Sequence, residues 1–176
     1  MLYSWKDIPV IMDSNNEKKN LLFEKTLAEA EAFYDSINDV ECPYFNDVVA
    51  FNLKGIKHIR FKKEKVARSH ADQFMRLKYI RLAPRVVEKS KTLQEYKQAK
   101  CFEELKSDGK RAKILQEVQY YGFIAILKDE LGRMTRLKVV VKQVGGGKPY
   151  FWSIIPFWKN NKDLDRQMHS GDLEED

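Results

Sequence analysis

The sequence contains little of the chemistry that marks disulfide-rich, metal-binding or membrane proteins. Its 176 residues include two cysteines, Cys42 and Cys101, which have no CxxC spacing and provide no disulfide framework. There are three histidines, and no two of them have the HxxxH spacing of a metal-binding helix. No apolar run approaches the roughly 20 residues that a membrane-spanning helix needs. We therefore expect no disulfide, no metal or other cofactor, and no membrane insertion.

Motifs for a phosphate-binding loop or a nucleophilic serine are also missing. The segment Gly145–Lys148 lacks the GxxxxGK[ST] spacing of a phosphate-binding loop, and Ser153 lacks the flanking glycines of a nucleophile elbow. The first ten residues, MLYSWKDIPV, do not place an apolar segment after a basic one, so no secretory signal is expected. A reducing cytoplasm fits these features, and so does an effector that is delivered without a cleaved signal.

Positive charge is concentrated in one block of the chain. Residues 54–100 contain 15 Lys and Arg against 4 Asp and Glu, whereas residues 1–53 contain 4 against 10. The formal net charge of the whole chain is +6. A local basic excess of this kind is typical of proteins that bind a phosphate backbone. The same block is also compatible with a solvated basic surface that has no ligand.

The pattern of apolar residues predicts an α+β protein, with N-terminal helices packed on a small antiparallel β-sheet. Ser14 and Glu17 form a capping box, which predicts the start of an amphipathic helix over residues 17–37. After the last aromatic residues the chain becomes polar and acidic, which is typical of disorder. The expected organisation is an N-terminal lead-in and helix (1–47), a folded domain (48–159) and an acidic disordered tail (160–176).

Two further stretches precede the sheet. Residues 48–62 are typical of two short strands, the second of which places His58 and Arg60 on one face. Residues 64–89 predict a basic helical stretch that Pro84 kinks or divides, because proline removes a backbone donor. Thr92 then predicts the start of a capped helix over residues 93–106.

Three aromatic and β-branched runs, residues 118–128, 136–144 and 150–158, predict an antiparallel meander joined by turns. In the middle strand a period of two places Leu137, Val139 and Val141 on one face, and Arg136, Lys138 and Lys142 on the other. An apolar lower face under a cationic upper face is suited to an anionic ligand.

The remaining polar residues have the types that a metal-independent ribonuclease needs. The 2′-hydroxyl of RNA is the nucleophile, so the protein must only move protons and stabilise the charge on the phosphorane. Histidine is suited to proton transfer near neutral pH, Lys and Arg to the charge, and hydroxyl groups to orienting the phosphate. The candidate catalytic residues are His58, Arg60, Tyr121, Arg136, Lys138 and Ser153.

Other cations are candidates for contacts with the nucleic-acid backbone. Lys78, Arg81 and Arg85 lie near one another on a helical wheel, beside the apolar stripe of the basic stretch. A position on the edge of the stripe places them at the border of a cleft. The candidate nucleic-acid-binding residues are Arg68, Lys78, Arg81, Arg85 and Lys142.

The order of motifs resembles a known superfamily. The motifs are GIKHIRFK, the arginine-rich RLKYIRLAP, the capped TLQEY, then YYGFIAIL, RLKVVVKQ, a glycine turn and YFWSIIPFW. In this order they resemble the phage- and mobile-element-associated nucleases of the barnase–EndoU–colicin–RelE (BECR) superfamily, over about residues 51–159. The resemblance implies N-terminal helices with a small antiparallel sheet, and an RNA-cleaving toxin or effector that needs no metal.

The resemblance also implies particular residues and partners. It assigns the early histidine to His58, the strand cation to Arg136 or Lys138, and the last-strand hydroxyl to Ser153. We expect RNA, or DNA, as the ligand, an antitoxin or immunity protein as the partner, and cleavage through a 2′,3′-cyclic phosphate. Two alternatives remain: a nucleic-acid-binding module without catalysis, and a structural or interaction protein of a mobile element.

Overall fold

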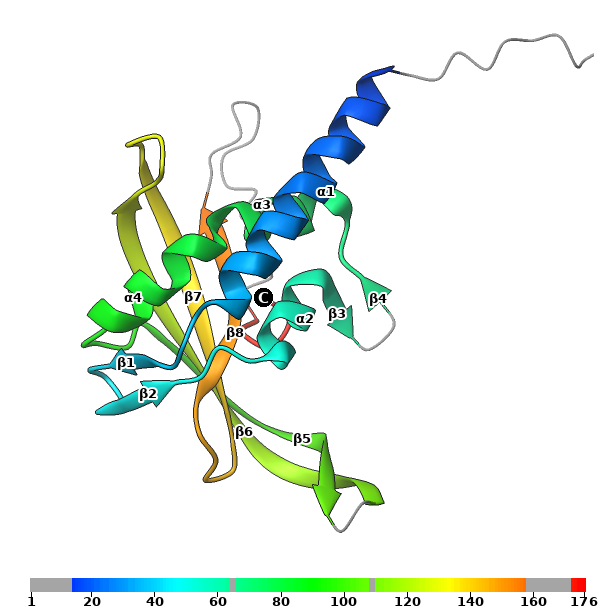
Figure 1. The fold of residues 1–176 in the computed structure, drawn as a ribbon. Coiled ribbons are helices and arrows are strands. Elements are labelled where there is room, and N and C mark those ends of the chain that lie inside the picture. Colours follow the sequence, from blue (N-terminus) through cyan, green and yellow to red (C-terminus); the bar gives the residue numbers. More distant parts are fainter. Residues whose placement is uncertain (1–13, 64–65, 108–109, 158–171) are drawn as a thin grey trace, which may run out of the picture.

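The computed structural model describes residues 14–63, 66–107, 110–157 and 172–176, and shows a mixed α+β protein (Figure 1). Its largest sheet has four antiparallel strands in the order β5-β6-β7-β8. These strands are β5 (Glu95–Ser107), β6 (Lys110–Lys128), β7 (Met134–Val144) and β8 (Tyr150–Phe157). The predicted α+β class and the three-strand meander are therefore confirmed, and the meander has a fourth strand on the β6 edge.

The first strand of the sheet differs from the sequence prediction. Residues 93–106 were expected to form a capped helix, but most of them lie in β5, which pairs with β6 from Glu95 opposite Gly122 to Ser107 opposite Lys110. The helical prediction was wrong because it used local capping and propensity alone. Strand pairing over thirteen positions satisfies the backbone groups of this segment and outweighs those local preferences.

The helices precede the sheet in the chain. Figure 1 shows α1, α3 and α4 on one side of the sheet and α2 beside the edge strand β8. The N-cap side chains are those of Asn52 for α2 and Ser69 for α3. Pro84 lies in the first turn of α4, so proline divides the basic stretch as the sequence predicts. The helices are α1 (Ser14–Asp35), α2 (Leu53–Arg60), α3 (His70–Tyr79), the 3₁₀ turn η1 (Ile80–Leu82) and α4 (Ala83–Lys89).

His58 lies on a helix and not on a strand. The expected pair of strands over residues 48–62 is present only as β2 (Asp47–Val49), paired with β1 (Val40–Cys42), and β3 (Phe61–Lys63), paired with β4 (Val66–Ala67). Between them the chain forms α2, because the side chain of Asn52 accepts a hydrogen bond from the Lys54 amide and starts a helix. His58 and Arg60 therefore do not share a face.

Both faces of the sheet are buried along the middle of β7, and the face of Lys138 and Lys142, which was expected to be a cationic platform, is covered as well. Leu137, Val139 and Val141 belong to the larger core, which also contains buried side chains of α1, α2, α3 and α4. The opposite face carries a smaller cluster of Val118, Tyr120, Val140, Ile155 and Leu173. Among the described residues no helix is both long and apolar enough to span a membrane.

Strand β8 contains a bulge that changes its alternation. Tyr150 lies opposite Lys142 and Ser153 lies opposite Val140, with the register shift between these two pairs. Cross-strand partners share a face, so Tyr150 and Ser153 both lie on the face of Lys142. The bulge residue between them is Trp152.

The end of the chain also differs from the expectation. Residues 160–171 of the predicted disordered tail lie outside the described residues. Residues 172–176 are packed on the protein: Leu173 is 4% exposed and Asp176 is 1% exposed. The carboxyl end of the chain lies between α2 and β8 (Figure 1). An acidic composition predicts disorder only where no tertiary partner is available, and here the sheet provides one.

Gly55 gives a stability prediction for the contact between α2 and β8. A Cβ at Gly55 would lie 2.4 Å from the main-chain oxygen of Phe151 and 2.6 Å from the Tyr34 hydroxyl. Gly55→Ala should lower the free energy of unfolding by about 1–3 kcal/mol through overpacking, although the same change in an open helix is stabilising by about 1 kcal/mol. Gly146→Ala, where no atom lies within 4 Å, is the control. Denaturant unfolding that ranks the two variants equally would contradict this prediction.

Candidate functional site: a buried cationic cluster beside strand β8

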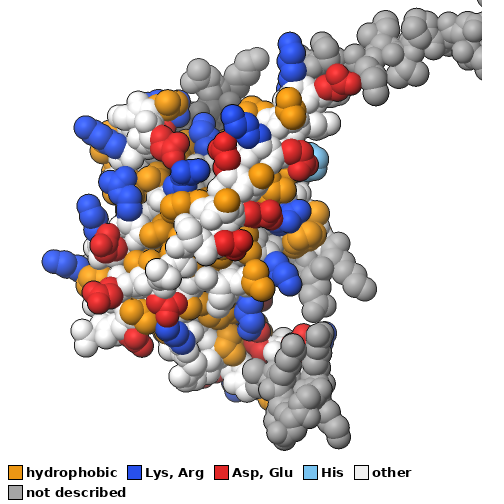
Figure 2. Space-filling model, viewed as in Figure 1, with side chains coloured by type: hydrophobic (Ala, Val, Ile, Leu, Met, Phe, Trp, Pro, Cys, Tyr) orange, Lys and Arg blue, Asp and Glu red, His pale blue; other side chains and the backbone are white. Residues whose placement is uncertain are grey.

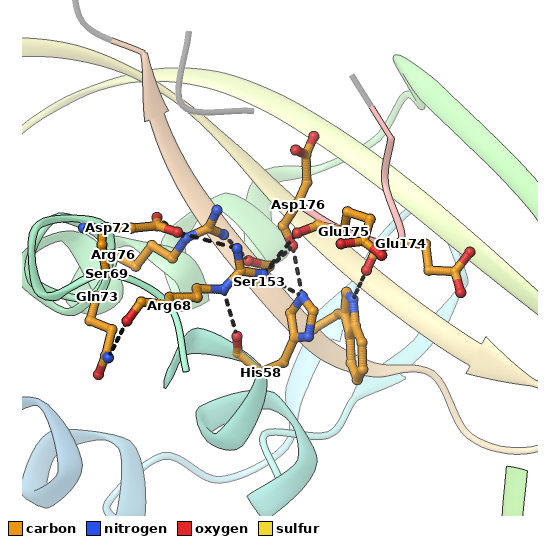
Figure 3. Close-up of polar contacts among 11 residues, drawn as sticks. His58, Arg68, Ser69, Asp72, Gln73, Arg76, Ser153, Glu174, Glu175 and Asp176 are labelled. Atoms are coloured by element: carbon orange, nitrogen blue, oxygen red, sulfur yellow. Dashed lines mark hydrogen bonds and ion pairs between the residues drawn. The ribbon is translucent and has the colours of Figure 1, made fainter. Parts of the chain in front are cut away.

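Three of the predicted catalytic residues come together at the β8 edge of the sheet. His58 comes from α2, Lys138 from β7 and Ser153 from β8, and all three are buried. Two arginines complete the cluster: Arg68, just before α3, and Arg76, within α3 (Figure 3). We call these five residues the cationic cluster. Its members come from segments that are far apart in the sequence, so only the tertiary fold assembles it.

His58 is held by contacts on several sides. Its imidazole ring stacks on Trp152, with ring centroids 3.8 Å apart and planes 19° apart. Its main-chain oxygen accepts a hydrogen bond from Arg68 Nε at 3.0 Å. Burial, followed by the positive charge of Arg68, lowers the pKa of His58 from its usual 6.5 to about 3. The imidazole is therefore neutral at physiological pH.

Two contacts make opposite demands on Nε2 of His58. The main-chain oxygen of Asp176 lies 2.8 Å away and can only accept a hydrogen, so this contact requires Nε2–H. Arg68 Nη2 lies 2.9 Å away and can only donate, so that contact requires an unprotonated Nε2. A neutral ring can either donate a hydrogen from Nε2 or accept one at Nε2, so it satisfies only one of these two contacts at a time. While Asp176 is in place, the tautomer with Nε2–H satisfies the carbonyl and leaves no lone pair on this nitrogen for another proton.

The two arginines share one carboxylate. Arg68 Nη1 lies 3.3 Å from Asp72 Oδ2, and Arg76 Nε lies 2.6 Å from Asp72 Oδ1. Arg76 Nη1 also donates to Ser153 Oγ at 2.6 Å. Burial, followed by the positive charge of Arg76, lowers the pKa of Arg68 from 12.5 to about 10, so Arg68 stays charged at neutral pH. Two buried cations therefore face one neighbouring carboxylate, which leaves an excess of positive charge.

Asp176 contacts three of the basic side chains of the cluster. Lys138 Nζ is fully buried and contacts Asp176 Oδ2 at 2.8 Å and Glu95 Oε2 at 2.9 Å. The main-chain oxygen of Asp176 contacts His58 and also lies 3.5 Å from Arg68 Nη2. The oxygens of one acidic residue are therefore held by an ammonium, a guanidinium and an imidazole. This is the donor set that binds an oxyanion.

A pocket of about 460 Å³ lies beside the cluster and shares His58 with it. Its other walls are Lys54, Lys57, Phe61, Lys62, Glu103, Lys142, Tyr150 and Trp152. Lys142 Nζ contacts Glu103 at 2.6 Å and lies 4.3 Å from the centre of the Trp152 ring. The Tyr150 hydroxyl is buried and has no hydrogen-bond partner in the described part of the chain. The pocket thus combines aromatic walls, four lysines and an available hydroxyl group.

The other predicted catalytic residues lie away from the cluster. Arg60 pairs with Glu31 of α1 at 3.1 Å. The guanidinium of Arg136 lies over the Phe157 ring, 4.7 Å from its centre. Tyr121 is opposite Val141, on the larger-core face of the sheet, and donates to Gln143.

The predicted nucleic-acid-binding residues are also distributed. Arg68 is in the cluster and Lys142 is in the pocket. Lys78 and Arg81 line a smaller pocket of about 190 Å³ beside the β6–β7 turn, and Arg85 lines another beside α4. On the face seen in Figure 2, Lys and Arg side chains are interspersed with Asp and Glu. The basic block of the sequence does not form a uniform basic surface there.

The candidate site residues named from the sequence do not include Asp72, Arg76, Trp152 or residues 172–176. The spacing of Arg68, Asp72 and Arg76 at i, i+4 and i+8 was a usable signal, because it places a carboxylate between two guanidiniums along a helix. The terminal segment gave no such signal. Among the described residues no group of three or more His, Cys, Asp and Glu side chains could hold a metal ion. Comparison of the chain with protein-family models, curated proteins and solved structures gives no match.

The buried His58 gives a prediction for stability against pH. Its pKa is lower in the folded than in the unfolded protein, so the unfolded state binds more protons between these two values. The stability contributed by the neutral ring is complete above about pH 6.5 and is lost as the pH falls toward 3. From pH 6.5 to 5, the wild type should lose about 1.5 kcal/mol more of its unfolding free energy than His58→Gln.

Urea unfolding at several pH values measures this difference. His70→Gln removes an exposed imidazole from α3 and is the matched control. Equal pH dependence in the wild type and His58→Gln would show that His58 is not buried as a neutral group.

Proposed function

We propose that the protein is a metal-independent endoribonuclease that cleaves RNA through a 2′,3′-cyclic phosphate. The observation that supports this function is the convergence of His58, Arg68 and Lys138 on the oxygens of Asp176. In the proposal, those oxygens mark the place of the oxygens of the scissile phosphate. A phosphodiester also carries one negative charge and offers oxygens that only accept hydrogen bonds, as the oxygens of Asp176 do.

The reaction needs two proton transfers and one charged site. Once Asp176 leaves, neutral His58 can adopt the tautomer that carries its proton on Nδ1, and the lone pair on Nε2 then takes the proton of the 2′-hydroxyl. The O2′–P bond forms while the P–O5′ bond breaks, and the ammonium of Lys138 gives a proton to the leaving 5′ oxygen. Arg68 stabilises the charge on the phosphorane. Arg76 and Ser153 position this group, because Arg76 is tied to Ser153 and shares Asp72 with Arg68.

The adjoining pocket supports a nucleotide substrate. Lys54, Lys57 and Lys62 line its wall and provide charge for neighbouring phosphates, and Tyr150 and Trp152 provide aromatic surface for a base. The pocket shares His58 with the cluster, so a nucleotide bound there would place its phosphodiester at the proposed catalytic group.

The wider context is proposed from the sequence motifs. An α+β architecture with a four-stranded antiparallel sheet agrees with the resemblance to the BECR superfamily at the level of class. On this basis we propose a toxin or effector of a phage or mobile element, acting in the cytoplasm of its host or target. An antitoxin or immunity protein would be its partner.

A second candidate is a nucleic-acid-binding module without catalysis. The observation that favours it is the pairing of the cluster: Arg68 and Arg76 are bound to Asp72, and Lys138 is bound to Glu95. These ion pairs would fix the cations for RNA binding just as well as for catalysis. This candidate predicts salt-sensitive RNA binding with no cyclic-phosphate product.

Cleavage of RNA in EDTA tests the proposed chemistry. The protein should release fragments with 2′,3′-cyclic phosphate ends, detected by mass spectrometry. His58→Gln and Lys138→Gln should each lower the rate by roughly 100-fold or more, the contribution of one positioned acid or base. Lys113→Gln, on an exposed position of β6, is the control for loss of one positive charge.

The contradicting result is RNA that stays intact with the wild type and also with a variant whose residues 172–176 have lost their acidic side chains. Salt-sensitive binding together with intact RNA would support the binding module instead.

Tyr150 gives a separate prediction for the pocket. Its hydroxyl has no described hydrogen-bond partner, so Tyr150→Phe should not lower the stability of the free protein. The same change should weaken RNA binding about fivefold, because one hydrogen bond contributes about 1 kcal/mol. Tyr96→Phe, at an exposed tyrosine, is the control. Fluorescence anisotropy with labelled RNA measures the affinity, and equal affinities for the wild type and Tyr150→Phe would exclude this hydroxyl from the binding site.

A further inference from the structure

Residues 172–176, Asp-Leu-Glu-Glu-Asp, lie across one face of the sheet, from the edge strand β5 to the cationic cluster at the opposite edge, beside β8. Lys97 Nζ of β5 contacts Asp172 Oδ1 at 2.6 Å and Glu174 Oε2 at 2.8 Å. Trp152 Nε1 donates to the main-chain oxygen of Glu174 at 3.3 Å, and Arg68 Nη2 donates to that of Glu175 at 2.8 Å (Figure 3). Together with the contacts of Asp176, these bonds attach the segment at every residue except Leu173.

Leu173 provides the apolar part of the attachment. Its side chain is 4% exposed and belongs to the smaller cluster with Val118, Tyr120, Val140 and Ile155. It also lies against Gly122, where a Cβ would come within 3.2 Å of Leu173 Cδ2. The sheet therefore buries one leucine, and the ammonium of Lys97 contacts the acidic residues on both sides of it.

We propose that the surface that holds residues 172–176, from Lys97 of β5 to the cationic cluster and here called the groove, is a binding site for an acidic peptide. We propose further that these residues occupy it in cis and exclude RNA by doing so. We call these residues the terminal segment. The exclusion of RNA rests on the proposed function. The binding of an acidic peptide does not, because it is inferred only from the contacts that residues 172–176 make.

The bound segment is incompatible with access to the cluster. With it in place, His58 is 4% exposed, and Lys138 and Ser153 are fully buried. Lys138 is bound to Asp176, and the Nε2–H of His58 is directed at the carbonyl oxygen of the same residue. A phosphate that entered the cluster would meet the carboxylate of Asp176 at the position it needs. The two anions therefore compete for one place.

Residues 172–176 compete effectively with RNA because they belong to the same chain as the site they occupy. A tethered ligand has a local concentration on the order of millimolar, so a peptide of modest affinity keeps its site occupied. RNA, or a partner that binds the terminal segment, would have to displace it. The segment carries several negative charges, as RNA does, and its leucine adds a contact that RNA does not have.

Neutralising the segment in the full chain tests the inference. The segment variant carries Asp172→Asn, Leu173→Asn, Glu174→Gln and Asp176→Asn. The matched control carries Glu17→Gln, Leu21→Asn, Glu24→Gln and Glu29→Gln, at exposed positions of α1, and changes the net charge by the same amount. Circular dichroism and thermal unfolding establish that both variants are folded. The segment variant should bind labelled RNA at least tenfold more tightly than the wild type, and the control should not.

A peptide added in trans gives a readout that is independent of RNA. A fluorescent, amidated peptide with the sequence DLEED should bind the segment variant, and a peptide with the sequence NNQEN should bind at least tenfold more weakly. The wild type, whose groove is occupied, should bind DLEED at least tenfold more weakly than the segment variant does.

Four outcomes decide the matter. Peptide binding that is confined to the segment variant, together with the gain in RNA affinity, supports the inference. Equal binding of DLEED to the segment variant and the control variant overturns it. A segment variant that does not fold also overturns it, because the segment would then be part of the core. Peptide binding with no cleavage of RNA supports the groove and contradicts only the ribonuclease proposal.

Discussion

The arrangement of the site depends on the burial of three cations at the edge of a sheet. Arg68, Arg76 and Lys138 are each at most 3% exposed. Removing such charges from water costs several kcal/mol for each ion unless partners compensate for it. Asp72 and Glu95 compensate in part, and Asp176 contributes a further carboxylate. Any group that replaces Asp176 must therefore be anionic, which limits the ligands of this cluster more than its shape does.

The sequence predicted the sheet better than the segments before it. The runs that form β6, β7 and β8 are rich in aromatic and β-branched residues and are joined by glycine-containing turns, in which Gly132 and Gly145 adopt positive φ values. Residues 93–106 have capping and helix-forming residues, and only pairing with β6 shows that most of them belong to a strand. The segment around His58 fits both a short strand and a one-sided helix. The Asn52 cap decided between them, and its effect was not recognised.

The site was predicted residue by residue but not as a constellation. His58, Lys138 and Ser153 were identified by residue type, and the fold brings them to one place. Arg60, Arg136 and Tyr121 have equally suitable side chains, yet helix α2 and the sheet register direct them elsewhere. The direction in which a side chain points depends on tertiary packing, so it could not be predicted from residue type. The terminal segment was unpredictable for a related reason. Its five residues form a short turn, in which the Glu175 and Asp176 amides donate to the main-chain oxygen of Asp172, but nothing in their sequence indicates the surface on which that turn is packed.

The bulge at Trp152 has a consequence for how this protein can change in evolution. Tyr150 and Ser153 are three positions apart, and in a regular strand they would lie on opposite faces of the sheet. The extra residue brings the pocket and the cluster to the same face. Loss of a single residue here would move one of the two hydroxyls into the larger core, while substitutions on either side of the bulge leave the pairing unchanged. Relatives of this chain should therefore tolerate new side chains in β8 far more readily than a change in its length.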